Sequence, residues 1–199
     1  MTFIRKKRFF GLLFLFILLL LFFKSAWMGR MLYPIRYQDE ITAAADQNNV
    51  DPLLIAAIIR VESNYRHDVV SHKGAYGIMQ VMPDTAQWIF EMEGFHQYKL
   101  SDLENPGINI LVGSKYLNFL NKQLGNNPYA VMAAYNAGQG KVAKWREEKI
   151  WDGSYATVDR IPFMETRKYV RSVTYYYDKY VKLYSGDFEN IRKEAPGRS

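Results

Sequence analysis

The sequence has no cysteine in its 199 residues. This absence excludes disulfide scaffolds, thiol nucleophiles, cysteine zinc sites and a lipid attached through a cysteine thioether. Fixed-period repeats and low-complexity tracts are absent from residues 31–199, where alternating strand-like runs are also rare. Acidic residues are missing from residues 1–30. These absences favour one mainly helical domain behind a separate amino-terminal segment.

The excess of positive charge lies at the amino terminus. The chain has 26 lysine and arginine residues against 20 acidic ones, and six of the basic residues fall in residues 1–30. Residues 31–199 are therefore formally neutral. A nucleic-acid-binding protein needs a basic face on its folded part. We therefore expect no nucleic acid partner.

The first 30 residues predict a membrane anchor. An apolar run begins at Phe9 after four basic residues, and the 20 residues from Phe9 to Met28 would rise about 30 Å as a helix, the thickness of the hydrocarbon core. We expect a single-pass, uncleaved signal anchor in the cell membrane, with a cytoplasmic amino terminus and the remaining chain on the outer side. A cleavable signal peptide is the alternative, although no small-x-small cleavage site follows the apolar run.

The rest of the chain predicts a series of helices. Asp51, Asn105 and Asn127 each precede a proline, as a capping residue precedes the first helical position. Gly125 and Gly138 fall where helices should end. The predicted helices are 35–48, 52–63, 83–92, 106–123, 128–136, 139–148 and 163–184, with a loop at 149–162. The predicted segments are a basic stub and anchor at 1–30, a membrane-proximal linker and first helix at 31–44, the main domain at 45–185 and a polar, frayed tail at 186–199.

Glu62 is the carboxyl group that fits its surroundings least. The helix 52–63 is apolar nearly all round, which predicts burial, and Glu62 shares the face of Ile55, Ile58 and Ile59. A carboxylate at the carboxyl end of a helix also opposes the helix dipole. Both effects disfavour the ionised form, so we predict a raised pKa, which a general acid requires. The alternative is a partly exposed glutamate in the last turn with no special role.

Two later segments carry groups suited to a sugar ligand. Two glycines three residues apart permit close backbone approach just before Met79 and Gln80, and Tyr135 and Asn136 end a helix of small residues. Hydroxyl and amide groups can hydrogen-bond sugar hydroxyl and acetamido groups. Taken singly, Met79 is also explained as a core residue and Asn136 as a helix cap.

Together, these blocks resemble the signature of the family 1, soluble-lytic-transglycosylase-type, lytic transglycosylases, whose fold is lysozyme-like. The resemblance covers about residues 45–180. It rests on Glu62-Ser63, Gly77-Ile78-Met79-Gln80 and Ala134-Tyr135-Asn136-Ala137-Gly138 in that order, with Ser71 nine residues after Glu62 and a late block from Glu165 to Val170. Ile78 stands where the family usually has leucine. Tyr76 occupies a variable position that often holds a smaller residue, and it could line a subsite.

The resemblance implies a role for each matching residue. Glu62 matches the single catalytic acid, and Glu165 is expected to play a supporting part. The substrate-binding residues implied are Ser71, Met79, Gln80, Tyr135, Asn136 and Tyr169. The three histidines lack the spacing of a zinc site, so we expect neither a metal nor a cofactor. The implied fold class is mainly α, a lysozyme-like transglycosylase domain preceded by a single transmembrane helix.

The implied reaction is cleavage of the β-1,4 bond between N-acetylmuramic acid and N-acetylglucosamine in peptidoglycan glycan strands. The C6 hydroxyl of the muramic acid attacks its own anomeric carbon, so one carboxylate suffices where ordinary glycosidases need two. Glu165 as a second catalytic carboxylate would instead give a hydrolase, such as a goose-type muramidase. A non-catalytic scaffold that binds peptidoglycan is the alternative from another class. Partners in a larger cell-wall assembly are not predicted.

Overall fold

The computed structural model describes residues 9–17 and 26–194, which divide into two units between Ile35 and Arg36. In the first unit, residues 9–17 are helical and α2 spans Ala26–Leu32. The expected membrane span, Phe9 to Met28, includes residues 18–25, which lie outside the described residues. Within the described parts of the chain, no helix is both long and apolar enough to cross a membrane.

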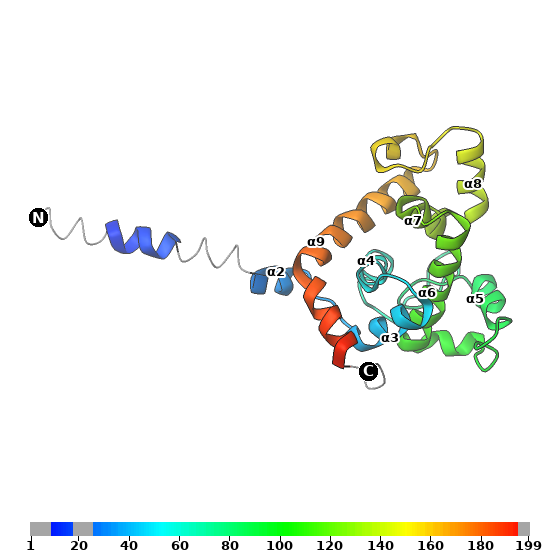
Figure 1. Ribbon diagram of the computed structural model, residues 1–199, viewed down its shortest axis with the longest axis horizontal. Coiled ribbons are helices and arrows are strands. Elements are labelled where there is room, and N and C mark those ends of the chain that lie inside the picture. The colour runs from blue at the N-terminus through cyan, green and yellow to red at the C-terminus, as the bar shows by residue number, and fades with distance from the viewer. Residues whose placement is uncertain (1–8, 18–25, 195–199) are drawn as a thin grey trace, which may run out of the picture. The chain divides into compact units, whose positions relative to one another are not determined.

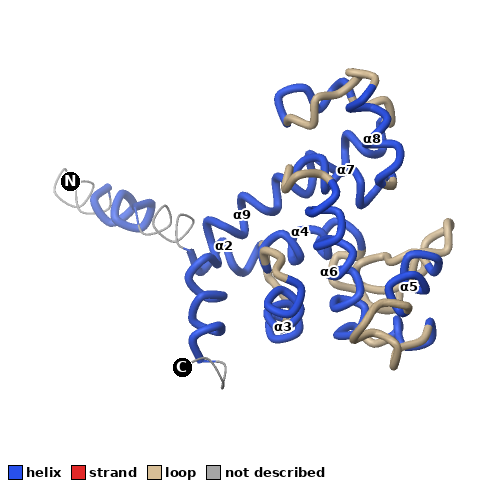
Figure 2. The backbone as a smooth tube through the Cα atoms, turned by 45° about the vertical axis from the view of Figure 1, so that its right-hand side comes forward, coloured by secondary structure: helices blue, strands red, loops and turns tan. Residues whose placement is uncertain are grey.

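Residues 36–194 form helices and loops with no β-strand (Figure 2). The mainly α class and all seven helices predicted after residue 34 are confirmed, with ends that differ by a few residues except at the end of the last helix. They are α3 (Gln38–Asn48), α4 (Pro52–Glu62), α5 (Pro83–Phe90), α6 (Pro106–Gln123), α7 (Pro128–Ala137), α8 (Gln139–Glu147) and α9 (Met164–Glu194). The sequence did not indicate two short 3-10 helices, η1 (Leu100–Glu104) and η2 (Tyr155–Arg160).

α9 is longer than the sequence predicts. The polar composition after Ser185 favours a frayed tail, but the helix continues to Glu194. Tyr184 and Phe188 are both buried and lie four residues apart, so they extend one buried stripe of α9 past the expected end. This buried stripe is the physical reason for the difference.

The predicted helix starts are confirmed by their capping bonds. The side chain of Asp51 accepts a hydrogen bond from the Leu53 N–H (2.8 Å), and those of Asn105 and Asn127 each accept two backbone N–H bonds at the start of α6 and α7. A proline follows each cap at the first helical position, where its missing N–H has no intrahelical partner to lose.

α4 lies at the centre of the helical unit, between α9 on one side and α6 on the other (Figure 1). Every residue from Pro52 to Ile59 is buried. Burying an isoleucine side chain contributes roughly 1.5–3 kcal/mol, so Ile55, Ile58 and Ile59 alone fix this helix firmly. Glu62 therefore stands on the last turn of the most deeply buried helix.

The turn Gly77–Gln80 is held by side chains from three helices. Ser63, next to the end of α4, donates from Oγ to the Ile78 carbonyl oxygen (2.7 Å). Asn109 of α6 accepts from the Met79 N–H (2.9 Å), and Tyr135 of α7 donates to the Met79 carbonyl oxygen (3.0 Å). These bonds reach the backbone of two consecutive residues, Ile78 and Met79, from three directions. The turn is therefore fixed relative to all three helices.

Two glycines permit this close packing. Gly77 has a φ of +77°, and a Cβ there would collide with the Asn109 side chain and lie 2.9 Å from the Leu103 carbonyl oxygen. A Cβ on Gly113 of α6 would lie 2.6 Å from Met79 Sδ. Any larger residue at either position would displace the turn from α6.

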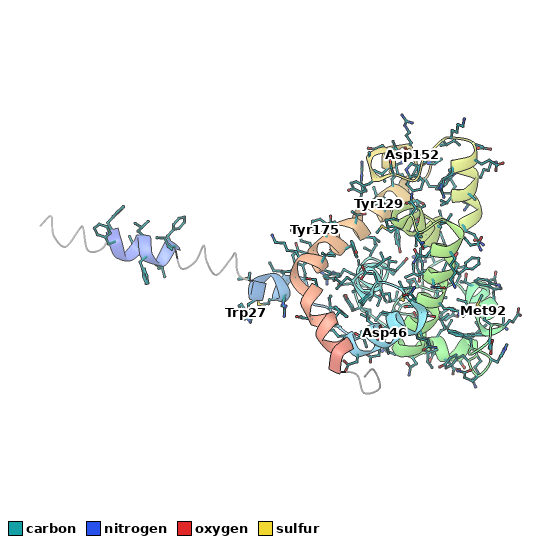
Figure 3. All side chains as sticks on the ribbon, viewed as in Figure 1. Trp27, Asp46, Met92, Tyr129, Asp152 and Tyr175 are labelled. Carbon is teal, nitrogen blue, oxygen red and sulfur yellow. The ribbon has the colours of Figure 1, made fainter. Side chains whose placement is uncertain are left out.

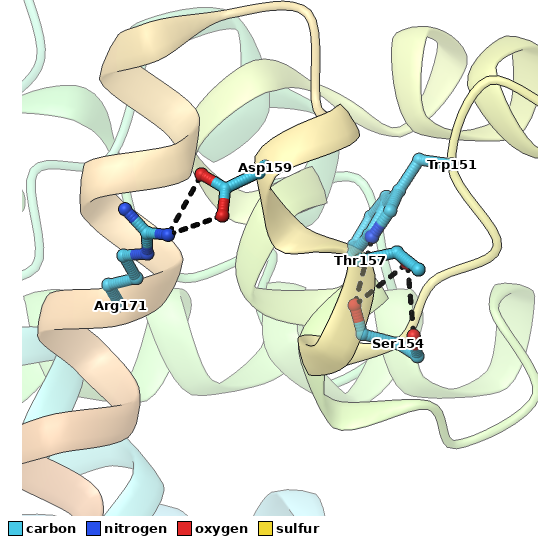
Figure 4. Close-up of polar contacts among 5 residues, drawn as sticks. All are labelled: Trp151, Ser154, Thr157, Asp159 and Arg171. Carbon is cyan, nitrogen blue, oxygen red and sulfur yellow. Dashed lines mark hydrogen bonds and ion pairs between the residues drawn. The ribbon is translucent and has the colours of Figure 1, made fainter.

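The predicted loop at 149–162 is tied to itself and to α9 (Figure 4). Arg171 of α9 donates to both carboxylate oxygens of Asp159 (2.8 Å each). Within the loop, Trp151 Nε1 donates to the Ser154 carbonyl oxygen (3.0 Å). The loop leads into the first turn of α9, so these contacts help to set where α9 begins.

Replacing Asn109 with leucine should destabilise the protein by about 2–4 kcal/mol. The Met79 N–H and the carbonyl oxygens of Tyr76 and Leu103, which Asn109 now pairs, would be left without a partner in the interior. Urea unfolding measures the loss. Asn118→Leu is the matched control, because Asn118 lies half-buried on the same helix and the structure gives it no side-chain hydrogen bond with a described residue. Equal stability of the two variants would contradict this account of the turn.

Candidate active site

A cavity of about 310 Å³ lies beside the carboxyl end of α4. Its walls come from α4, from the loop between α4 and α5, from α7 and from the first turn of α9. Six of the residues singled out in the sequence line it together: Glu62, Ser71, Gln80, Tyr135, Asn136 and Glu165. The remaining lining residues are His72, Lys73, Ala75 and Met82.

A second cavity, of about 240 Å³, adjoins the first. Four residues line both: Gln80, Met82, Tyr135 and Asn136. The second cavity extends toward α5 and α6, where Thr85 and Tyr116 line it, and its remaining lining residues are Val81, Ala137 and Gly138. The two cavities therefore form a continuous groove, which suits an elongated ligand better than a small compact one.

The Glu62 carboxyl group has a strongly perturbed pKa. Burial raises the pKa to about 7, contact with the Tyr169 hydroxyl lowers it, and the negative charge of Glu165 raises it. The raised pKa predicted from the sequence is confirmed, with burial as its main cause. Near neutral pH a substantial fraction of this group carries a proton, so Glu62 can both donate and accept one.

Two tyrosines flank Glu62 as neutral hydroxyl groups. Burial first, and then the charge of Glu62, raise the pKa of Tyr135 and of Tyr169 well above the ordinary value of 10.0. The hydroxyl of Tyr169 is buried and interacts with the Glu62 carboxyl. It forms no hydrogen bond of ideal geometry with any described residue. Tyr169 therefore meets Glu62 from the core and lines neither cavity.

Asn136 and Ser71 present fixed polar groups to the cavity. Thr166 of α9 donates from Oγ1 to Asn136 Oδ1 (2.8 Å), which leaves the NH₂ group of Asn136 as the part available to a ligand. Ser71 Oγ accepts from the Ala75 N–H (2.9 Å), so its own hydrogen can be donated elsewhere. Both side chains are thus oriented before any ligand arrives.

Gln80 and Met79 are adjacent in the chain but take different positions. Gln80 Nε2 donates to the carbonyl oxygens of Val69 (3.0 Å) and Gly77 (2.8 Å), which holds the side chain in the wall of both cavities. The Met79 side chain is 0 % exposed and packs in the core beside Gly113. The structure therefore does not bring the Met79 side chain to the groove, and only its backbone helps to build the site.

Lys73 and Glu165 form an ion pair at the cavity wall. Lys73 Nζ lies 3.2 Å from Glu165 Oε2, and both side chains are mostly exposed. A pair with this exposure adds little to stability. The pair matters electrostatically, because Lys73 balances the charge of Glu165. Among the described residues, Glu62 has no such ion pair.

Sequence reasoning missed several residues that shape the site. Lys73, His72 and Met82 line the cavity, Thr166 holds Asn136, and Asn109 holds the turn that ends in Gln80. An asparagine in an otherwise apolar turn of α6 was the one available signal for Asn109. Across the described residues, no cluster of three histidine, aspartate or glutamate side chains could hold a metal ion.

Comparison with known proteins gives consistent matches. Residues 39–157 match the model of the transglycosylase SLT domain. The soluble lytic murein transglycosylase of Salmonella typhimurium is 35 % identical over 165 residues, covering 82 % of this chain and 25 % of that protein. The chain therefore spans about a quarter of the length of this relative.

Two solved structures are similar in fold and sequence. The 70-kDa soluble lytic transglycosylase of Escherichia coli matches with a TM-score of 0.73 and 33 % identity, over 86 % of this chain and 28 % of that one. The lytic transglycosylase Slt of Pseudomonas aeruginosa, solved as an inactive glutamate-to-glutamine mutant, matches with a TM-score of 0.70 and 31 % identity. That match covers 77 % of this chain and 25 % of the other.

Glu62→Gln should stabilise the protein at pH 8 but not at pH 4. The pKa of the Glu62 carboxyl is about 7 in the folded protein, against an ordinary value of 4.5, so the unfolded chain loses this proton first as pH rises. The wild-type protein therefore loses stability between about pH 4.5 and pH 7, by at most about 3 kcal/mol. Urea unfolding at several pH values measures the difference between the two proteins. Glu148→Gln, at an exposed glutamate, is the control, and a pH-independent effect of Glu62→Gln would contradict the assigned pKa.

Proposed function

This chain belongs to the transglycosylase SLT domain family, and on that premise we propose that it is a peptidoglycan lytic transglycosylase. The proposed substrate bond is the β-1,4 link between N-acetylmuramic acid and N-acetylglucosamine, and the proposed product carries a 1,6-anhydromuramyl end. One observation supports this above all: a single carboxyl group with a pKa of about 7 stands in a groove of oriented hydroxyl and amide groups.

The proposed reaction uses Glu62 twice. Protonated Glu62 donates its proton to the glycosidic oxygen as the bond from that oxygen to C1 of the muramic acid breaks. The resulting carboxylate then accepts the proton of the C6 hydroxyl while the C6 oxygen bonds to C1 and closes the anhydro ring. Glu62 ends protonated, as it began, and no water is consumed. Attack within one sugar ring has a high effective molarity, so a second carboxylate is unnecessary.

The neighbouring groups have proposed roles that follow from their positions. Tyr169 is a neutral hydroxyl beside Glu62 and can hold the carboxyl group without adding charge, whereas Tyr135 donates its hydrogen to the Met79 carbonyl oxygen and adds a second neutral neighbour. Ser71 and the NH₂ group of Asn136 can orient the 2-acetamido group, which stabilises the positive charge that develops at C1. Gln80 contributes to binding from its fixed place between the two cavities.

The hydrolytic alternative needs Glu165 as the second catalytic carboxylate. Glu165 forms an ion pair with Lys73. A carboxylate that activates water becomes neutral when it accepts the proton, which would leave the charge of Lys73 without its partner. The ion pair therefore favours a supporting role for Glu165. The Pseudomonas aeruginosa protein was solved as an inactive mutant in which one glutamate is replaced, so that protein needs at least this one glutamate for activity.

Incubation of the purified protein with cell-wall sacculi should release muropeptides one water lighter than hydrolytic products. Glu62→Gln should lower the rate by a factor of roughly 10²–10⁴ through loss of general acid–base catalysis. Mass spectrometry of the released fragments measures both. Glu148→Gln should keep full activity, since its site is exposed and lies on the C-terminal side of α8.

The products separate the alternatives. Fragments with a free reducing end would make the enzyme a muramidase. Sacculus binding without release of any fragment would make the chain a scaffold. Full activity of Glu62→Gln would refute the assigned mechanism in either case.

We also propose that residues 9–28 anchor the protein in the cell membrane, with the helical unit on the cell-wall side. The support is the apolar sequence and the six basic residues around it. Leu13→Arg combined with Ile17→Arg should move the protein to the soluble fraction after an alkaline carbonate wash, because each charge costs about 2.5–3.5 kcal/mol at the centre of a span. The matched double alanine variant should stay in the membrane fraction. Wild-type protein that washes off, or that has lost residues 1–30, would contradict the anchor.

A further inference from the structure

An aromatic surface continues the groove beyond the smaller cavity. Tyr116 of α6 lines that cavity, with its ring centroid 5.6 Å from that of Tyr135. Trp88 of α5 packs edge-on against Tyr116 (6.5 Å) and against Phe119 (4.6 Å). We call Trp88, Tyr116 and Phe119 the aromatic shelf. A chain of ring contacts thus leads from the tyrosine beside Glu62 to the outside of α5.

Helix register places the shelf in line with the groove. Thr85 and Tyr116 line the cavity, and Trp88 and Phe119 follow them by three residues on α5 and α6. Residues three apart share a helix face, and three residues advance about 4.5 Å along the axis. Trp88 and Phe119 therefore lie on the same helix faces as Thr85 and Tyr116, about 4.5 Å farther along each helix.

The core does not account for Trp88. Ala86, Ile89 and Phe90 already supply the buried face of α5, whereas Trp88 remains 37 % exposed. A large ring held in place by two aromatic neighbours and open to solvent is a rigid, amphipathic surface. Such a surface loses little conformational entropy when a ligand covers it.

The chemistry of the groove indicates what covers the shelf. A pyranose ring has polar edges and faces of C–H groups, so it hydrogen-bonds at its rim and stacks on aromatic rings. The cavities supply amide and hydroxyl groups at Gln80, Asn136 and Tyr135, and the shelf supplies flat apolar rings directly beyond them. A polymer of sugars matches this succession.

We propose that the aromatic shelf binds one further sugar ring of the glycan strand, beyond those held in the two cavities, so that the protein prefers long strands to short ones. The inference rests on the proposed function for the identity of the strand. It adds Trp88 as a residue that determines preference for strand length.

Binding of uncrosslinked glycan strands with one, two and three disaccharide repeats tests the proposal. Titration calorimetry with the Glu62→Gln protein should show affinity rising with strand length. Adding Trp88→Ala should weaken binding of the longest strand roughly tenfold, which corresponds to about 1.4 kcal/mol, and leave the shortest strand unaffected. Adding Trp88→Phe should retain most of the length dependence, because a stacking ring remains.

Tyr155→Ala is the matched control. Tyr155 is an exposed ring that packs at a tilt against Tyr129 (centroids 5.4 Å apart) and lines neither cavity. Figure 3 labels Tyr129 at the start of α7, well away from Met92, which follows α5. Removing this ring should leave the length dependence unchanged.

Two outcomes would contradict the proposal that the aromatic shelf binds a sugar ring. One is equal weakening of all strand lengths by Trp88→Ala with a drop in thermal stability, which would make Trp88 a packing residue. The other is affinity that does not rise with length in the Glu62→Gln protein. Cleavage of the same strands by the wild-type protein is followed in parallel. Absence of anhydro products would refute the proposed function, whereas the binding data test the proposal about the aromatic shelf separately.

Discussion

The clamp on the Gly77–Gln80 turn is the constraint on which the rest of the site depends. Ser63, Asn109 and Tyr135 bind its backbone from three different helices. Each bond is modest by itself, but all three are buried or partly buried, where an unpaired polar group is costly. The turn cannot move without breaking bonds to α4, α6 and α7 together. Ser63 follows Glu62 directly, and Gln80 closes the turn, so the same clamp fixes the carboxyl group relative to the groove.

The groove combines rigidity with one energetically unfavourable group. Glu62 stands at the end of a helix whose burial stabilises the fold, and that burial raises the pKa of its carboxyl to about 7. Ionisation of this group lowers the stability of the fold near neutral pH, and carboxyl groups with a perturbed pKa are typical of functional sites. Neutral tyrosine hydroxyls beside it avoid placing a second charge in the interior. Charged partners occur farther out, where Lys73 and Glu165 meet at an exposed part of the wall.

Much of this arrangement is readable in local sequence. Capping residues before prolines located the starts of α4, α6 and α7, because caps act within three residues. The apolar helix ending in Glu62 predicted the raised pKa. The blocks that resemble lytic transglycosylases identified six residues that the structure gathers around one cavity. Met79 shows the limit of such reasoning, since a residue within a motif can contribute its backbone while its side chain packs in the core.

The sequence by itself thus determined the helical class, the places where helices begin and the chemical character of the site. Only the tertiary structure decided which distant residues act as partners: Asn109 for Met79, Thr166 for Asn136, Lys73 for Glu165 and Trp88 for Tyr116. These partners lie about 30 to 90 residues apart in sequence. Helix caps and periodicity are fixed by neighbours along the chain, whereas a contact between helices depends on how their faces pack, and no short stretch of sequence contains that information.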